Sequence, residues 1–304
     1  MNLCRCHRAQ CALAMLLTVS CFTTSVFAAA RRNFIPASSF RDEFVVTWAP
    51  NNVRFPEVNS DALQLVLDQN TGSGFASKDS FLFGNIDMEM KLIPGDSAGT
   101  VTTFYLSSEG SNHDELDFEF LGNTSGQPYA LQTNVFSSGI GGREQRIFLW
   151  FDPTKDFHTY SVRWSPYRVV FLVDGTPIRV FSNNEAVGVP YMRNQPMRVF
   201  SSIFNGDSWA TQGGAVKIEW SHGPFAASYR GFSASNACRA SSSAGAVACV
   251  RAASNHISAT GGMPKQKGFN RRRLNWVKRN FMIYDYCKDV ARYSPAPPEC
   301  TREF

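Results

Sequence analysis

The sequence predicts an all-β protein in which two antiparallel sheets pack as a sandwich, followed by a short C-terminal extension. Short segments that alternate between apolar and polar residues, rich in β-branched and aromatic side chains, follow one another from about residue 34 to 225. Turn residues separate them, and Asp174–Gly175 lies between two such segments as the turn of a hairpin. With little helical periodicity between the strands, a sandwich is the favoured architecture. The expected strands are residues 63–69, 85–93, 101–108, 115–122, 129–136, 157–165, 168–175 and 197–205.

The character of the chain changes after about residue 230, where small and polar residues become frequent. Residues 271–281 predict one helix, because their apolar side chains recur on one face. Residues 281–287 predict a further strand that could lengthen one of the sheets. We therefore expect a sandwich domain over residues 29–230 and an extension over 231–304.

The first 28 residues read as a signal peptide. Arg5 and Arg8 precede the apolar run 11–28, and the small residues at its end offer cleavage sites. A membrane anchor is the alternative, but five Ser and Thr residues dilute the run, and a spanning helix needs about 20 mostly apolar residues. No later segment is apolar enough to span a membrane. We expect a secreted chain with no membrane attachment after the signal is removed.

Composition and charge narrow the class of protein. The 304 residues include 25 Phe, 9 Tyr and 6 Trp, which suits a β-rich core or a surface that stacks on flat ligands. The net charge of +5 falls to +3 without residues 1–28, a mildly basic value that would suit residence near an acidic polymer matrix.

The basic residues of 271–279 could be read as a nucleic-acid site. A solvated helix face is the better interpretation, because an exported chain without a recognition motif has no such partner. Nothing suggests an oligomer.

The cysteines agree with export. Four lie before residue 22 and none lies between 22 and 237. The remaining four most simply form two disulfides, for which three pairings are possible. The nearest-neighbour pairing closes two short loops, joining Cys238 to Cys249 and Cys287 to Cys300. There is no CxxC pair and no helical His spacing, so we expect no metal site and no cofactor.

Residues 113–125, HDELDFEFLGNTS, place three acids on alternate positions of one expected strand. Glu115, Asp117 and Glu119 therefore share a face, while the apolar residues between them face the core. A plain polar outer face is one interpretation, but three adjacent acids repel one another and cost stability. A calcium site is a second, although the glycine turn and the backbone carbonyl ligands of calcium loops are missing.

Glycosidic chemistry is the third interpretation of this strand. Retaining enzymes place two carboxyl groups about 5–5.5 Å apart around the scissile bond. Cα atoms four residues apart on a strand lie roughly 13 Å apart, and two glutamate side chains that lean inward can close that gap around a bound sugar. A proton shared within the cluster would raise the pKa of one member and so supply an acid beside an ionised nucleophile.

The strand strongly resembles the active-site strand of the xyloglucan endotransglucosylase/hydrolases, plant enzymes of glycoside hydrolase family sixteen. Similar segments extend over essentially the whole mature chain, namely LQTNVF, GREQRIFLWFDPT, WATQGG and the ending FMIYDYCKD…RY…PPEC. The resemblance implies a concanavalin-like jelly-roll sandwich, with Glu115 as nucleophile, Glu119 as general acid/base and Asp117 as a helper bonded to Glu115. It also implies an N-glycan on Asn123, within the sequon Asn123–Ser125, and residence in the plant cell wall or apoplast.

Gln132 and Asn134 alternate on one strand, so both can face a cleft and bond sugar hydroxyls. The resemblance implies a larger set of substrate-binding residues: Gln132, Thr133, Asn134, Arg143, Glu144, Trp209, Ala210, Gly214, Tyr284 and Arg292. Tyr284 and Arg292 would border the acceptor side. Two residues depart from the family pattern: Phe204 stands where many relatives have Trp, and Gly142 where Asp is frequent.

The resemblance implies an endo-acting retaining transglycosylase that cuts the β-1,4-glucan backbone of xyloglucan and transfers the new end to another xyloglucan chain or oligosaccharide. A well-oriented acceptor can compete with water, since effective molarities of about 10⁵ M or more are attainable. Two alternatives stay open: a predominant xyloglucan hydrolase, and a non-catalytic carbohydrate-binding sandwich.

Overall fold

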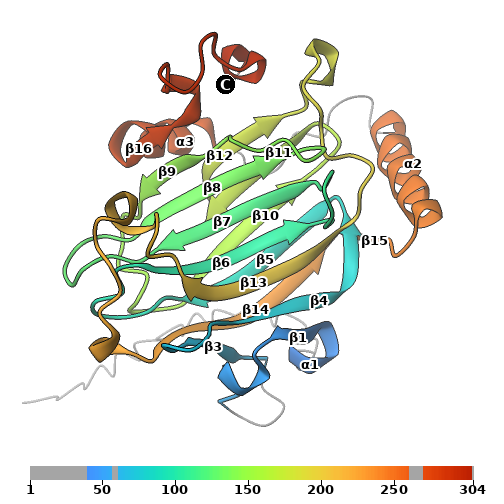
Figure 1. Cartoon of the computed structure of the whole chain (residues 1–304). Helices are drawn as coiled ribbons and strands as arrows, with labels where there is room; N and C mark the ends of the chain where they lie inside the picture. The colour runs from blue at the N-terminus through green and yellow to red at the C-terminus, as the bar shows by residue number, and fades with distance from the viewer. Residues whose placement is uncertain (1–39, 57–60, 260–269, 303–304) are drawn as a thin grey trace, which may run out of the picture. The chain divides into compact units, whose positions relative to one another are not determined.

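A computed structural model describes residues 40–56, 61–259 and 270–302. These residues form one compact unit, a sandwich of two antiparallel sheets with the extension against it (Figure 1). The all-β prediction and the two-sheet architecture are confirmed. The expected signal peptide, residues 1–28, lies outside the described residues together with its four cysteines. Among the described residues, no helix is both long and apolar enough to cross a membrane.

The larger sheet has nine strands and carries the catalytic candidates. Along its hydrogen-bonded path the strands are β1 (Phe44–Trp48), β4 (Ser73–Leu82), β13 (Met197–Asn205), β6 (Thr100–Ser107), β7 (Glu115–Leu121), β8 (Ala130–Phe136), β9 (Gln145–Phe148) and β16 (Met282–Asp285). The short β15 (Cys238–Arg239) pairs with β4 off this path. Figure 1 shows this sheet towards the viewer.

The second sheet has seven strands and lies behind the first (Figure 1). Its order is β12 (Thr176–Ser182), β11 (Arg168–Val173), β10 (His158–Trp164), β5 (Gly84–Lys91), β14 (Phe225–Ser235), β3 (Leu63–Leu67) and β2 (Val53–Arg54). The helices are α1 (Phe40–Glu43), α2 (Ser243–Ala259) and α3 (Arg271–Asn280). Short 3₁₀ turns are η1 (Pro50–Asn52), η2 (Glu185–Val187), η3 (Thr211–Gly214), η4 (Trp220–His222), η5 (Tyr286–Lys288) and η6 (Pro298–Arg302).

The apolar residues of β7 anchor it to the core between the sheets. Leu116, Phe118 and Phe120 are fully buried. The ring of Phe118 lies 5.2 Å from that of Phe171 in the opposite sheet, edge to face. Because a strand alternates its faces, this anchoring turns the three acids of β7 to the outer face of the nine-stranded sheet.

The eight predicted strands are all present with small changes at their ends. Sequence reasoning missed β1, β2, β4, β9, β14 and β15. Strands β2, β9 and β15 are two to four residues long, too short for a clear alternation signal. Sequence reasoning also missed helix α2, in the small and polar segment after Arg239. A tertiary constraint holds this helix, since the Cys238–Cys249 disulfide ties it to β15. Strand β14 continues to Ser235, beyond the boundary expected at residue 230, because it pairs with β5 up to that residue.

The extension closes the edge of the sandwich. The predicted strand is β16, which pairs with β9 and lengthens the nine-stranded sheet, and the predicted helix is α3, which packs against β12 of the other sheet. Buried Leu274 and Val277 form the apolar face of α3. The nearest-neighbour disulfides are confirmed, with Cα–Cα distances of 5.7 Å for Cys238–Cys249 and 5.4 Å for Cys287–Cys300.

Candidate active site

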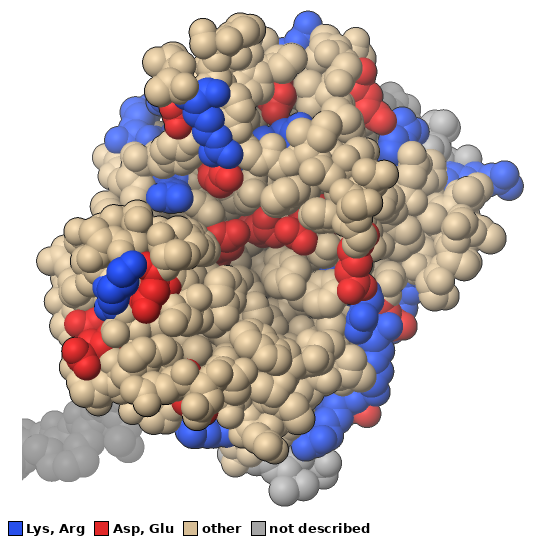
Figure 2. All heavy atoms as spheres, in the orientation of Figure 1, with Lys and Arg blue, Asp and Glu red and all other residues tan. Residues whose placement is uncertain are grey.

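Strand β7 pairs in unbroken register with β6 and β8, and this register assembles the site. Opposite each acid stand two residues that share its face: Ser107 and Phe136 for Glu115, Tyr105 and Asn134 for Asp117, Thr103 and Gln132 for Glu119. Figure 2 shows acidic side chains gathered in a hollow over the centre of this sheet. The three predicted catalytic acids therefore lie together at the floor of an open cleft.

One row of residues crosses the whole sheet through Glu119, and we call it the Glu119 row. Each member stands opposite the next across a strand pair, except that Ser202 and Thr103 are joined by a 2.9 Å hydroxyl–hydroxyl hydrogen bond. From edge to edge the row consists of Trp48, Gly74, Ser202, Thr103, Glu119, Gln132, Arg146 and Tyr284. The row runs across the strands, which is the direction available to a polymer that passes the three acids.

Asp117 is the most buried of the three acids, with 4% of its surface exposed. Burial raises the pKa of its carboxyl well above the usual value, and the negative charges of Glu115 and Glu119 raise it further. Its side chain hydrogen-bonds Glu115. The raised pKa favours the protonated form of Asp117, which can donate this bond to Glu115.

Glu119 is set up to exchange a proton near neutral pH. Burial raises the pKa of its carboxyl to about 7. The Gln132 amide opposes this effect by donating a 2.5 Å hydrogen bond to Glu119 Oε2, and Arg146 Nε in turn donates to Gln132 Oε1. A carboxyl group with this pKa has the property that a general acid/base needs.

The side chains of Asn134 and Thr133 point to opposite faces of the sheet, because the two residues are neighbours on one strand. Asn134 lies on the cleft face, where its Oδ1 accepts bonds from the backbone N–H groups of Val135 and Arg143 and leaves the amide nitrogen as a donor. Thr133 lies on the core face, is 2% exposed and accepts a bond from Arg179 Nη1. The side chain of Thr133, which was expected to bind substrate, therefore points away from the cleft, since successive residues of a strand face opposite sides.

Arg143 was expected to bind substrate, but it is 6% exposed and lies inside the protein. Its Nε donates a 2.7 Å bond to the carboxylate of Glu299 in η6, and Nη1 bonds the backbone carbonyls of Val135 and Ile140. Arg143 therefore organises Asn134 and the extension without facing the cleft. This buried pair joins the extension directly to the strand beside the catalytic acids.

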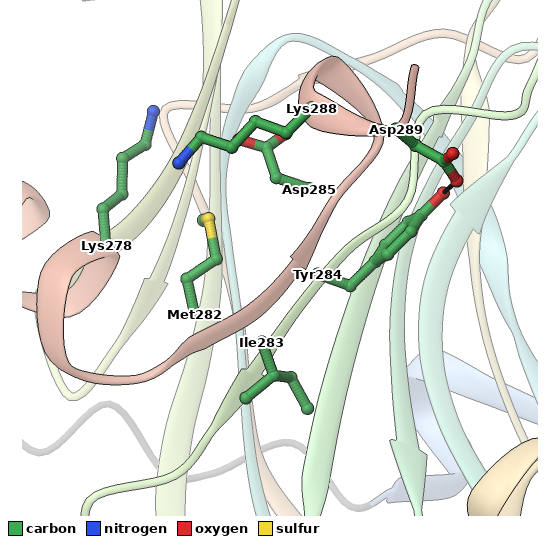
Figure 3. Close-up of a pocket in the computed structure, with 7 residues that line it drawn as sticks. All are labelled: Lys278, Met282, Ile283, Tyr284, Asp285, Lys288 and Asp289. Carbon is green, nitrogen blue, oxygen red and sulfur yellow. Dashed lines mark hydrogen bonds between the residues drawn. The ribbon is translucent and has the colours of Figure 1, made fainter. Parts of the chain in front are cut away.

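The other predicted residues of the extension lie at the β16 end of the Glu119 row. Arg292 forms a 2.7 Å ion pair with Glu144, and Tyr284 donates a 2.8 Å bond to Asp289. The guanidinium of Arg146 lies over the Tyr284 ring. Figure 3 shows the Tyr284 hydroxyl bonded to Asp289 beside a pocket of about 310 Å³. The structure thus brings Glu144, Tyr284 and Arg292 together at this end of the row.

Trp209 lies near the C-terminal end of β7. It is half-buried against a small apolar cluster that contains Leu121 and Ala210. Ala210, expected among the substrate-binding residues, is buried. Gly214 serves the loop, because it has φ +89° and a Cβ there would lie 2.4 Å from the Ser208 carbonyl oxygen. Phe204 packs on the same cluster.

Gly142 also has a positive φ, and its carbonyl accepts a bond from the Tyr293 hydroxyl.

Sequence reasoning missed several residues of the cleft face. Tyr105 stands opposite Asp117 and stacks on Phe200 with ring centroids 5.2 Å apart. Burial, then the charges of Glu115 and Asp117, raise the pKa of Tyr105 to about 12, so it stays a hydrogen-bond donor. Alternation in the segment VTTFYLSS places Thr103 and Tyr105 on one face, but it cannot show which strand lies beside it. No three His, Cys, Asp or Glu side chains of the described chain form a candidate metal site.

The family model of glycosyl hydrolases family 16 matches residues 40–222, and a model of the xyloglucan endo-transglycosylase C-terminus matches residues 267–300. The chain belongs to glycosyl hydrolase family 16. Within the family it is 52% identical to xyloglucan endotransglucosylase/hydrolase protein 15 of Arabidopsis thaliana, over 88% of this chain and 91% of that protein. It is 49% identical to xyloglucan endotransglucosylase protein 1 of Diospyros kaki, over 94% of both chains. The predicted membership of the xyloglucan endotransglucosylase/hydrolases is therefore confirmed.

Solved structures share the fold. The Crh5 transglycosylase in complex with NAG matches with a TM-score of 0.52 and 25% identity, over 69% of this chain and 86% of that one. The catalytic domain of an endo-1,3-β-glucanase from Thermotoga petrophila matches with a TM-score of 0.52 and 16% identity, over 67% and 96%. These neighbours bear out the jelly-roll sandwich.

Proposed function

We propose that this family 16 protein is a retaining transglycosylase that cuts the β-1,4-glucan backbone of xyloglucan and transfers the new end to another xyloglucan chain. The observation that carries the proposal is the unbroken register of β7, which lines up Glu115, Asp117 and Glu119 on the cleft face of one strand. The names of the relatives, xyloglucan endotransglucosylases at about half identity, support the substrate.

In the first half of the reaction Glu115 attacks the anomeric carbon of the donor chain and forms a covalent glycosyl-enzyme. Asp117 donates its hydrogen bond to Glu115 and so orients the attacking carboxylate. Glu119, whose pKa of about 7 leaves it protonated in mildly acidic solution, gives its proton to the departing sugar oxygen.

In the second half Glu119, now ionised, accepts a proton from the 4-hydroxyl of the acceptor chain, which attacks the glycosyl-enzyme. Gln132 and Arg146 support the ionised form of Glu119 through their hydrogen-bonded chain. Tyr284 and the Glu144–Arg292 pair at the β16 end are placed to hold the acceptor. A held acceptor gains a large effective concentration over water.

Hydrolysis is the second candidate, because water can replace the acceptor at the same glycosyl-enzyme. It would use the same acids and differ only in how well the β16 end holds a sugar chain. A purely carbohydrate-binding sandwich has less support, since nothing in sugar binding alone requires three neighbouring acids with raised pKa values on two of them.

We further propose that the protein acts as a secreted monomer in the plant cell wall. The positively charged start and apolar run of residues 1–28 support export. The two disulfides agree with an oxidising compartment. Asn123 lies two residues after β7, in a sequon, and is only partly buried, as an N-glycan site requires.

Incubation with xyloglucan and a fluorescent oligosaccharide acceptor tests the proposal. Entry of label into high-mass polymer is expected for transfer. New reducing ends without label would instead show hydrolysis. A folded protein that produces neither would contradict both enzymatic functions and leave carbohydrate binding as the remaining candidate.

A further inference from the structure

Trp48 is an exposed aromatic residue on the cleft face of the nine-stranded sheet, far from the catalytic acids. It ends the edge strand β1 and is 41% exposed. Alternation along β1 would direct it to the core with Phe44 and Val46, both of which pack there. A register shift between Val46 and Trp48 reverses this direction and pairs Trp48 with Gly74. Bulges of this kind re-aim a side chain at a sheet edge.

The partners of Trp48 place it at one end of the Glu119 row. Gly74 pairs with Ser202, the Ser202 hydroxyl bonds that of Thr103, and Thr103 pairs with Glu119. Residues directly opposite in antiparallel strands share a face. Four strand spacings separate β1 from β7, or about 19 Å before curvature of the sheet. Trp48 therefore lies on the path of a chain that crosses the strands through the catalytic centre.

Two glycines lie beside Trp48: Gly74 stands opposite it on the next strand, and Gly72 lies against its ring. A Cβ at Gly72 would lie 2.8 Å from Trp48 Cη2 and 1.9 Å from the Ile203 carbonyl oxygen. A Cβ at Gly74 would lie 3.0 Å from the Ser201 carbonyl oxygen. A larger side chain at Gly72 would collide with the indole, so this glycine makes room for the ring. A large part of the ring stays open to solvent.

The two ends of the Glu119 row carry different kinds of side chain, and this difference indicates which end holds the acceptor and which the donor. The β16 end has Tyr284 together with the charged Glu144–Arg292 pair, proposed above to hold the acceptor. The β1 end lies on the opposite side of Glu119 and offers an aromatic ring over glycines. A donor chain that leaves the catalytic centre on this side passes over β6, β13 and β4 before it reaches Trp48.

We propose that Trp48 is a stacking platform for a distal glucosyl unit of the donor chain, and that it makes the enzyme favour donors long enough to reach β1. The inference rests on the proposed function. The flat apolar face of a β-linked glucosyl ring is a suitable ligand for an indole face, because stacking removes apolar surface of both from water. A donor oligosaccharide too short to cross four strands gains nothing from this contact.

Donor kinetics in three variants test the inference, with the acceptor concentration fixed. Trp48→Ala raises the KM for high-mass xyloglucan about tenfold and changes the KM for a short xyloglucan oligosaccharide donor by less than about twofold. Trp48→Phe gives an intermediate KM for the polymer. Trp276→Ala is the matched control, because Trp276 is 40% exposed on α3 and lies outside the row. It changes neither KM.

Other outcomes separate the inference from the proposed function. Equal increases in KM for long and short donors would show a general structural effect and overturn the inference, as would an unchanged KM for the polymer in Trp48→Ala. If Trp48→Ala does not fold, Trp48→Phe decides the question. If the KM for the polymer and its ratio to the KM for the short donor are both unchanged in Trp48→Phe, the inference is overturned. A folded wild-type protein without transfer or hydrolysis would overturn the proposed function, and the inference with it.

Discussion

The centre of the cleft and its two ends are built by different means. At the centre, β7 pairs with β6 and β8 over seven residues each without a register shift. At the ends, the edge strands β1 and β16 each contain a shift, just before Trp48 and Tyr284 respectively. The regular centre holds the reacting groups at fixed spacing, whereas the irregular edges select which side chains face the sugar chain. Chemistry should therefore depend on the centre, and substrate length and acceptor use on the edges.

The largest effect is expected at the centre. Glu115→Gln keeps the size of the side chain and removes the nucleophile, so both transfer and hydrolysis should fall by about 10⁴-fold or more. Product formation from xyloglucan measures the loss, and a thermal melt confirms that the variant is folded. Turnover equal to that of the wild type would contradict the assignment of Glu115 as nucleophile.

The second effect concerns the connection between centre and extension. Glu299→Ala leaves the buried Arg143 guanidinium without its carboxylate, and the unfolding free energy should fall by about 3–5 kcal/mol. Chemical denaturation measures this. Glu185→Ala is the matched control, because its partner Arg193 is exposed and the loss should stay within about 1 kcal/mol. Similar losses in the two variants would mean that the buried pair does not hold the extension.

A smaller effect is expected on the pH profile. Glu119 must be protonated to act as an acid, and its pKa is about 7, so kcat/KM should fall as the pH rises through that value. Gln132→Leu removes a hydrogen bond that favours the ionised carboxylate, so the pKa rises and the alkaline limb moves to higher pH. Gln64→Leu, in the other sheet, serves as the control. Movement of the limb to lower pH in Gln132→Leu would contradict the role of this amide.

The smallest effect is expected at the β16 end. Arg292→Ala removes the partner of Glu144 on the exposed acceptor side, and the acceptor KM should rise by roughly threefold to tenfold while the donor KM changes little. Transfer assays at varied acceptor concentration measure it, with exposed Arg272→Ala on α3 as the control. A rise in donor KM alone would place Arg292 on the other side of the scissile bond.

The catalytic acids at the centre of the site could be predicted from the sequence, because their positions depend only on neighbouring residues of one strand. Alternation over residues 115–121 places the acids and the core residues on opposite faces, and neither depends on a distant segment. The same reasoning, applied strictly, would have excluded Thr133 from the cleft. It could not place Tyr105 beside Asp117, because strand neighbours and register are set by contacts between segments far apart in the chain.

From its sequence alone this protein has a determined fold class and family, since these rest on alternation within short segments and on motifs along the chain. The pairing of the four cysteines was one of three possibilities until the structure showed it. The tertiary structure decided the burial of Arg143 with Glu299, 156 residues away, and the outward turn of Trp48. Both depend on how an edge of the sheet is closed or bulged. Such features arise from packing between distant segments, which no local pattern of residues records.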